Sequence, residues 1–147
     1  MLVEWVIVER LLLSAFLGGL IGVERELNDK PAGYRTHVLV CVGSTMFTLI
    51  SLSLVAPSGS SVDTMRVAAG VVTGIGFLAA GSIFRDKDRV RGMTTAADIW
   101  VLAAIGMGVG LGLYVLALMA TAISLTVLIL GKFFDGFLKK RATQAQS

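Results

Sequence analysis

Apolar runs that approach or reach the length of a membrane span dominate this sequence of 147 residues. Three of them cover residues 5–23, 36–55 and 67–84, and a longer one covers residues 96–130 with Asp98 as its only charged residue. A hydrocarbon core about 30 Å thick is crossed by about 20 residues of helix. The pattern therefore predicts an all-α, polytopic integral membrane protein.

The longest apolar run is too long for a single crossing. Residues 96–130 would form a helix of about 50 Å, well beyond the hydrocarbon core, so we expect two helices here. The turn between them should lie at residues 108–112, where three glycines permit a tight reversal. This predicts a bundle of five transmembrane helices in a domain of residues 1–134, followed by a short basic cytoplasmic tail at residues 135–147.

Lys and Arg residues fall almost entirely in alternate connections. The connection after the first run holds three, the connection after the third run holds four, and the segment after residue 130 holds four of the thirteen. Basic residues are enriched in cytoplasmic loops, so we expect these segments inside, the N-terminus outside and the C-terminus inside. The same placement makes the basic residues topology signals, and no nucleic-acid partner is expected.

Three polar segments, residues 22–26, 32–37 and 91–100, meet at the predicted cytoplasmic ends of the helices. We expect a polar inner-face site there, formed by Glu24, Arg25, Glu26, Arg35, Thr36, His37, Arg91, Thr94, Thr95 and Asp98. No enzymatic activity is expected, because a nucleophile–base pair needs a third, orienting group, and no complete catalytic set occurs in the sequence.

Asp98 has two interpretations. Thr95 and Asp98 match the capping-box spacing at a helix start, where the acid would complement the positive end of the helix. Alternatively, Asp98 is an acid within a span, which predicts a buried pair with a basic group. Arg25, Arg35 and His37 are the candidate partners.

Glu24 and Glu26 flank Arg25 at the end of the first apolar run. They are either solvated charges at a helix end, or one of them turns inward to pair with Arg35 or Arg91 or to bind a hard cation. Mg²⁺ suits one or two carboxylates with retained waters. No cofactor is expected, and bound Mg²⁺ remains an open alternative.

A second polar set lies toward the predicted outer side. It consists of Glu9, Arg10, Asp63 and Arg66, which we expect to be buried polar groups. Arg10 is deep enough in its span to need a partner, and Asp63 is the predicted one. The alternative is that Glu9 and Arg10 line an outer vestibule.

Glycines at a spacing of four occur in three of the predicted spans. The pairs are Gly18 and Gly22, Gly70 and Gly74, and Gly106 and Gly110. Small residues let helix backbones approach closely within a membrane. These stripes predict either compact packing within one chain or a homodimer.

In its polar segments the chain resembles the MgtC/SapB family of bacterial inner-membrane proteins. That family shows the runs G-x-E-R-E, A-G-L-R-T-H, R-V-A, G-I-G-F-L-G-A-G and R-G-L-T-T-A-A followed by I-W. They correspond here, in order, to residues 22–26, 32–37, 66–68, 74–81 and 91–100. The chain differs at Tyr34, Ala79, Met93 and Asp98, where the family has leucine, glycine, leucine and a small or hydroxyl residue.

The resemblance implies a multi-pass protein of the bacterial inner membrane. It links the chain to growth at low magnesium, to intracellular survival of pathogens and to inhibition of the proton-translocating ATP synthase. We therefore expect a regulator of another membrane complex such as the ATP synthase, with the lipid bilayer and a second copy as further partners. A small transporter or channel for a cation or small solute is the alternative. Longer members of the family carry a soluble C-terminal domain after this region.

Overall fold

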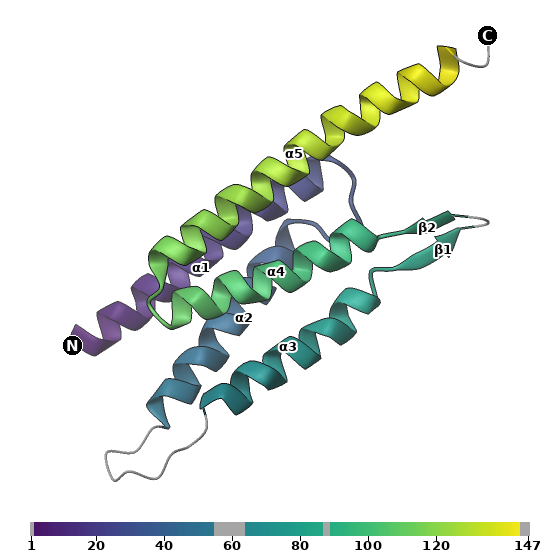
Figure 1. Ribbon diagram of the computed structural model, residues 1–147. Helices are drawn as coiled ribbons and strands as arrows, with labels where there is room; N and C mark the ends of the chain where they lie inside the picture. The colour runs from purple at the N-terminus through teal and green to yellow at the C-terminus, as the bar shows by residue number, and fades with distance from the viewer. Residues whose placement is uncertain (1, 55–63, 87–88, 145–147) are drawn as a thin grey trace.

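The computed structural model describes residues 2–54, 64–86 and 89–144. Its elements in chain order are α1 (Leu2–Leu27), α2 (Tyr34–Ser53), α3 (Thr64–Ala80), β1 (Phe84–Asp86), β2 (Arg89–Arg91), α4 (Met93–Gly110) and α5 (Tyr114–Gln144). The helices run back and forth along a common direction, so that consecutive helices have opposite senses (Figure 1). The helical bundle is therefore as predicted.

The predicted turn in the long apolar run is confirmed. α4 ends at Gly110, and Gly112 has a positive φ of 78° before α5 begins at Tyr114. The Leu113 N–H donates to the Gly108 carbonyl at 2.8 Å, and the Gly112 N–H donates to the Val109 carbonyl at 3.0 Å. This is the Schellman arrangement, in which a left-handed glycine closes the end of a helix.

Four helices in the described part of the chain are long and apolar enough to cross a membrane. They are Glu4–Leu27, Tyr34–Ser53, Met93–Gly110 and Tyr114–Phe133. The apolar part of α3 is shorter, at Met65–Ala80, and all of α3 is only about 25 Å long. The structure thus supports a membrane protein with four span-length helices, while a fifth crossing stays a prediction.

The predicted third span was wrong at its C-terminal end. Residues 67–84 were expected to be one helix, but α3 ends at Ala80. The Ser82 and Ile83 N–H groups donate to the Ala79 and Ala80 carbonyls, which closes a turn after the helix. The chain then leaves the bundle and enters the segment that begins at Phe84.

The segment after α3 is a β-hairpin, which corrects the all-α prediction. Phe84 pairs with Arg91, Arg85 with Val90, and Asp86 with Arg89, in antiparallel register. All six residues are exposed. The Asp86–Arg89 pair places opposite charges directly across the ladder, an arrangement that stabilises two short strands.

Helix α2 contacts α1, α3 and α4, and α4 contacts all four other helices. Its contact with α1 is close at Gly18 of α1, where an added Cβ would lie 2.9 Å from the His37 carbonyl oxygen. Its contact with α4 is close at two glycines of α4. An added Cβ would meet the Cys41 carbonyl at Gly106 and Thr48 at Gly110. Two of the three glycine stripes therefore pack within the chain, as small residues allow.

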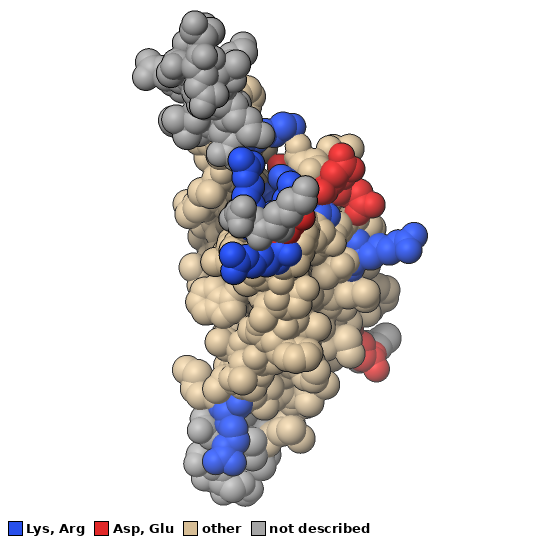
Figure 2. All heavy atoms as spheres, turned by 90° about the vertical axis from the view of Figure 1, so that its right-hand side faces the viewer, with Lys and Arg blue, Asp and Glu red and all other residues tan. Residues whose placement is uncertain are grey.

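The connections of the bundle separate into two ends. The α1–α2 connection, the hairpin and the C-terminus lie at one end, and the N-terminus and the α4–α5 turn lie at the other (Figure 1). Most of the basic side chains on the face seen in Figure 2 gather in its upper half, and the zone below them is largely uncharged. The first end is thus the one that holds the basic connections identified in the sequence.

Candidate functional site

A buried acid joins three helices near the basic end of the bundle. Asp98 lies in the second turn of α4, and its side chain is 4% exposed. Its Oδ2 atom is 3.0 Å from Nε2 of His37 on α2 and 3.7 Å from Nε of Arg25 on α1. We call these three residues together with Glu24 the buried ion cluster.

Both ring nitrogens of His37 have polar partners. Its Nδ1 atom lies 2.9 Å from the Gly33 carbonyl oxygen, which is an acceptor, so Nδ1 carries a proton and donates. Its Nε2 atom lies 3.0 Å from the Asp98 carboxyl group. His37 therefore links the Gly33 carbonyl to the Asp98 carboxyl group.

Arg25 balances the acids of the cluster. Its side chain is 4% exposed, and its Nη1 atom donates to Oε2 of Glu24 at 3.3 Å. Its Nε atom faces Asp98 and makes no other polar contact in the described part of the chain. Asn28 in turn donates from Nδ2 to Oε1 of Glu24 at 2.7 Å. Arg25 therefore bridges two carboxylates, and Asn28 holds one of them in place.

Close packing of α1 on α2 makes this bridge possible. A Cβ at Gly22 would lie 2.8 Å from Cα of Tyr34 and 2.9 Å from Cβ of His37. Any larger residue would push α1 away from α2 at the level of the cluster. Arg25 is one turn further along α1, so this glycine keeps the guanidinium within reach of Asp98.

The capping interpretation of Asp98 is wrong. The N-cap residue of α4 is Gly92, with φ of 88° and no side-chain hydrogen bond to the helix start. Asp98 is the sixth residue of the helix, beyond the first turn where backbone N–H groups lack partners. The other interpretation, a buried pair with a basic group, is what the structure contains, with both Arg25 and His37 as partners.

The structure brings together only part of the predicted inner-face site. Four of the ten residues, Glu24, Arg25, His37 and Asp98, form the cluster, and Thr95 is also buried. Exposed positions on the chain surface are occupied by Arg35, Thr36, Arg91 and Thr94. The structure thus divides the predicted residues between a buried cluster and an exposed surface.

Glu26 and Arg91 have partners of their own at this end of the bundle. The Glu26 carboxylate accepts a hydrogen bond from the Tyr34 N–H at 2.7 Å, so it caps the start of α2 from outside that helix. Arg91 pairs with Asp86 at 3.7 Å across the exposed hairpin. Neither Glu24 nor Glu26 forms the predicted pair with Arg35 or Arg91.

The outer polar set is mostly not buried. Glu9 and Arg66 are exposed on the chain surface, and Asp63 lies outside the described residues. Arg10 is half-buried and donates from Nη1 to the Gly110 carbonyl at 2.7 Å and from Nε to the Tyr114 hydroxyl at 3.2 Å. Arg10 therefore ties α1 to the α4–α5 turn, a contact across about 100 residues that no sequence spacing indicates.

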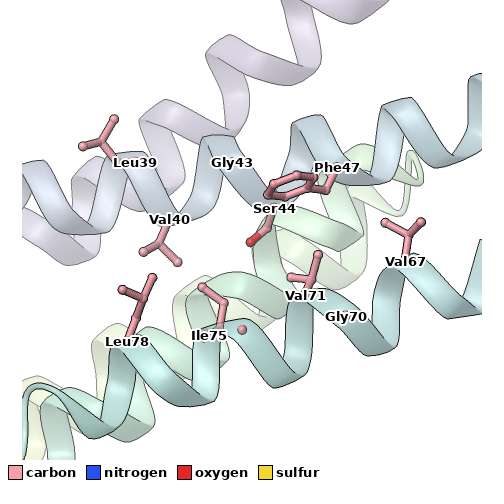
Figure 3. Close-up of a pocket in the computed structure, with 11 residues that line it drawn as sticks. Leu39, Val40, Gly43, Ser44, Phe47, Val67, Gly70, Val71, Ile75 and Leu78 are labelled. Atoms are coloured by element: carbon pink, nitrogen blue, oxygen red, sulfur yellow. The ribbon is translucent and has the colours of Figure 1, made fainter.

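Two observations bear on ligand binding. Among the described residues, no three His, Cys, Asp or Glu side chains come together as a metal site. An apolar cavity opens between α2 and α3 (Figure 3), away from the buried ion cluster. Hydropathy does not predict this cavity, because its two walls belong to separate predicted spans.

Comparison with known proteins assigns the chain to a family. The model of the MgtC family matches residues 11–137. The chain belongs to the MgtC family. The matched range includes α2, α3, α4 and the whole buried ion cluster, so the polar segments that first suggested this family lie inside it.

Several curated MgtC-type proteins are similar to the chain. The protein MgtC of Brucella abortus (strain 2308) is 54% identical over 97 residues, which are 65% of this chain and 39% of that protein. MgtC of Salmonella typhimurium is 45% identical over 120 residues, 82% of this chain and 50% of that protein. The "Putative magnesium transporter YhiD" of Escherichia coli K12 is 47% identical over 102 residues, 67% of this chain and 47% of that protein.

The chain spans about half the length or less of these three relatives. The similarity is therefore a similarity to one part of each relative, and it covers the helical region. No solved structure matches the chain.

Proposed function

We propose that this chain is a regulator that binds another protein complex in the bacterial inner membrane, with the proton-translocating ATP synthase as the partner. The observation that carries the proposal is the environment of Asp98. This acid is buried against Arg25 and His37 of the same chain, at 3.7 and 3.0 Å. A cation at Asp98 would be repelled by the adjacent guanidinium, so the acid serves to hold α1, α2 and α4 together.

Family membership supports a task in ion homeostasis. The resemblance to MgtC/SapB proteins links the chain to growth at low magnesium, intracellular survival and inhibition of the ATP synthase. The inner-membrane location, the cytoplasmic position of the basic end and five membrane crossings are parts of the same proposal.

Helix α5 is the surface on which we place the partner contact. Its segment Tyr114–Phe133 is the least buried of the four span-length helices, so most of its side chains face outward. Ala122 is an exposed small residue on this helix, and small residues are favourable points of contact between membrane helices.

A cation transporter is the second candidate. The observation in its favour is the pair of carboxylates Glu24 and Glu26 at the end of α1, together with the name of the Escherichia coli relative. Glu26 is exposed, and carboxylates with retained waters suit Mg²⁺.

Reconstitution into phospholipid vesicles separates the two candidates. The chain is first incorporated alone, and Mg²⁺ entry is followed with an enclosed fluorescent indicator. It is then incorporated together with purified ATP synthase, and ATP-driven proton pumping is followed by the quenching of a pH-sensitive dye.

A regulator should give no Mg²⁺ entry above protein-free vesicles, and it should reduce proton pumping several-fold. Ala122→Trp should remove that reduction, whereas Gly76→Trp, at an exposed position of α3, should leave it. Mg²⁺ entry that is lost in Glu26→Gln, with pumping unchanged, would instead establish the transporter.

A further inference from the structure

The hairpin between α3 and α4 is an exposed ladder with an excess of positive charge. Its six strand residues include one acid, Asp86, and three bases, Arg85, Arg89 and Arg91. The Asp86 carboxylate lies 3.7 Å from Arg91. Residues 87–88 lie outside the described part of the chain, and in the sequence they add one base and one acid. Three guanidinium groups against one carboxylate therefore leave the hairpin with two surplus positive charges.

The base of the hairpin is fixed to the ends of two helices. Three residues separate α3 from Phe84, and Gly92 alone separates β2 from α4. Gly92 has a positive φ of 88°, and an added Cβ there would collide with the Ser82 carbonyl oxygen, so the two ends of the hairpin are in contact. Helix α4 is about 27 Å long, close to the thickness of the hydrocarbon core. When α4 crosses the membrane, the base of the hairpin therefore lies at the edge of that core.

Apolar side chains lie at or beside the base of the hairpin, and charged side chains lie farther out. The exposed apolar residues are Ile83, Phe84, Val90 and Met93. The pair of the ladder that is farthest from the helices consists of Asp86 and Arg89. A ladder of three pairs is about 10 Å long, and the polar headgroup layer of each leaflet is about 5–8 Å thick. A hairpin that starts at the edge of the hydrocarbon core therefore extends through the headgroup layer.

We propose that this hairpin binds the headgroups of anionic phospholipids. Its surplus positive charge is complementary to a leaflet that contains anionic lipid, and basic segments beside a membrane helix are attracted to such a leaflet. All the bases of the two strands are arginines, whose planar guanidinium groups donate two parallel hydrogen bonds to a phosphate. The exposed apolar side chains at the base remain in contact with acyl chains while the guanidinium groups bind the phosphates.

The charges around the hairpin disfavour a second copy of the chain as its partner. Lys30 and Arg35 are exposed in and beside the α1–α2 connection, which lies at the same end of the bundle as the hairpin (Figure 1). Two copies that met through this end would bring bases against bases. Lipid phosphates, by contrast, lie at the level of the hairpin wherever α3 and α4 enter the membrane. The inference rests on the membrane location of the chain and not on the regulator proposal.

Quenching of the two native tryptophans by brominated lipids tests the site in the full chain. Trp100 lies about 10 Å along α4 from its hairpin end, Trp5 lies near the start of α1 at the other end of the bundle, and both are exposed. Trp5→Phe leaves a reporter at the hairpin end, and Trp100→Phe leaves one at the other end. Each protein is reconstituted into vesicles of equal amounts of phosphatidylglycerol, which is anionic, and phosphatidylcholine, with bromine on the acyl chains of one lipid or the other.

Phosphatidylglycerol should be enriched several-fold over phosphatidylcholine at the reporter of the hairpin end, and not at the other reporter. Arg89→Gln together with Arg91→Gln removes the surplus charge of the hairpin and should abolish this enrichment. Lys30→Gln together with Arg35→Gln is the matched control, because it removes two exposed charges from the same end of the bundle and should leave most of the enrichment. Circular dichroism and gel filtration report whether each variant keeps the helical fold.

Three outcomes would overturn the proposal. Equal quenching by the two brominated lipids at the hairpin end would show that no anionic headgroup is selected there. Equal losses in the two folded double variants would mean that any base at this end suffices and that the hairpin is not the site. Enrichment that persists in folded Arg89→Gln with Arg91→Gln would exclude the lipid, and a loss of ATP synthase inhibition in that variant would then assign the hairpin to a protein partner.

Discussion

The two sides of α2 differ in how they use the same small-residue spacing. Against α1 and α4, glycines bring the backbones so close that an added Cβ at Gly22 or Gly106 would collide. Against α3, Gly70 and Gly74 face open space. A Gly-x-x-x-Gly stripe therefore permits close approach without causing it. The polar contacts beside the stripe decide which helices pack closely.

On its closed side, α2 makes polar side-chain contacts with α4. His37 and Thr45 of α2 reach Asp98 and the Gly106 carbonyl of α4, at 3.0 and 2.8 Å. The cavity between α2 and α3 is lined by apolar side chains and the single hydroxyl of Ser44. In lipid there is no hydrophobic drive between apolar helices, so the side with polar contacts is the one that packs tightly.

The largest effect should come from breaking the buried ion cluster. Asp98→Asn keeps the shape of the side chain but removes the carboxylate that faces both His37 and Arg25, and leaves Glu24 as the one acid beside the buried guanidinium. Removal of one partner of a buried pair costs about 3–5 kcal/mol, so we expect a loss of this size in the free energy of unfolding. Titration with sodium dodecyl sulfate in mixed micelles, followed by far-ultraviolet circular dichroism, measures it. An unchanged unfolding midpoint would show that the cluster does not hold the three helices together.

Alanine at matched glycines should give effects of opposite sign on the two sides of α2. Gly106→Ala places a methyl group against the Cys41 carbonyl, and overpacking of this kind costs about 1–3 kcal/mol. Gly74→Ala meets no atom within 4 Å and should stabilise α3 by about 0.5–1 kcal/mol, because alanine favours a helix over glycine. The same titration compares the two variants. Equal destabilisation by both would contradict the distinction between a closed and an open side.

A smaller effect is expected at Thr45, which links α2 to α4. Thr45→Val removes the hydroxyl that lies 2.8 Å from the Gly106 carbonyl oxygen. Hydrogen bonds between membrane helices contribute about 0.6 kcal/mol on average, and we expect a loss of that order. Thr126→Val is the control, because its hydroxyl donates only to Ala122 within α5. If both variants lose the same stability, the contact between the helices contributes nothing of its own.

The smallest effect is expected in the hairpin. Asp86→Asn removes the partner of Arg91 at 3.7 Å, but both side chains are more than half exposed. Exposed pairs contribute about 0–1 kcal/mol, so the unfolding midpoint should hardly move. This variant is also the matched control for Asp98→Asn, since it makes the same chemical change in an exposed pair. A loss as large as that of Asp98→Asn would mean that the hairpin supports the bundle.

Much of the architecture could be predicted from local sequence. Hydropathy located the helices, and the glycines at residues 108–112 located the turn between α4 and α5, because both signals depend on neighbouring residues. The end of α3 at Ala80 was missed, since residues 81–84 are apolar enough to extend a helix. The hairpin was missed because its alternating charges also fit a solvated loop.

The candidate site was predictable in its members but not in its contacts. The sequence indicated the polar ends of α1, α2 and α4, and it named Arg25 and His37 among the partners of Asp98. It could not separate Arg35, which is exposed, from Arg25, which is buried, because both lie at helix ends beside charged residues. The orientation of each residue on its helix, relative to the other helices, made the difference.

The sequence by itself determined that the chain is a helical membrane protein of the MgtC family, because apolar length and ordered polar motifs are properties of the chain alone. The tertiary structure decided which glycine stripes lie at close helix contacts and which polar side chains are buried. Two glycine stripes lie at close helix contacts and the third faces open space, and one acid at the basic end of the bundle is buried between a guanidinium and an imidazole. Close approach and burial depend on segments far apart in the chain, so they exist only once the helices have packed.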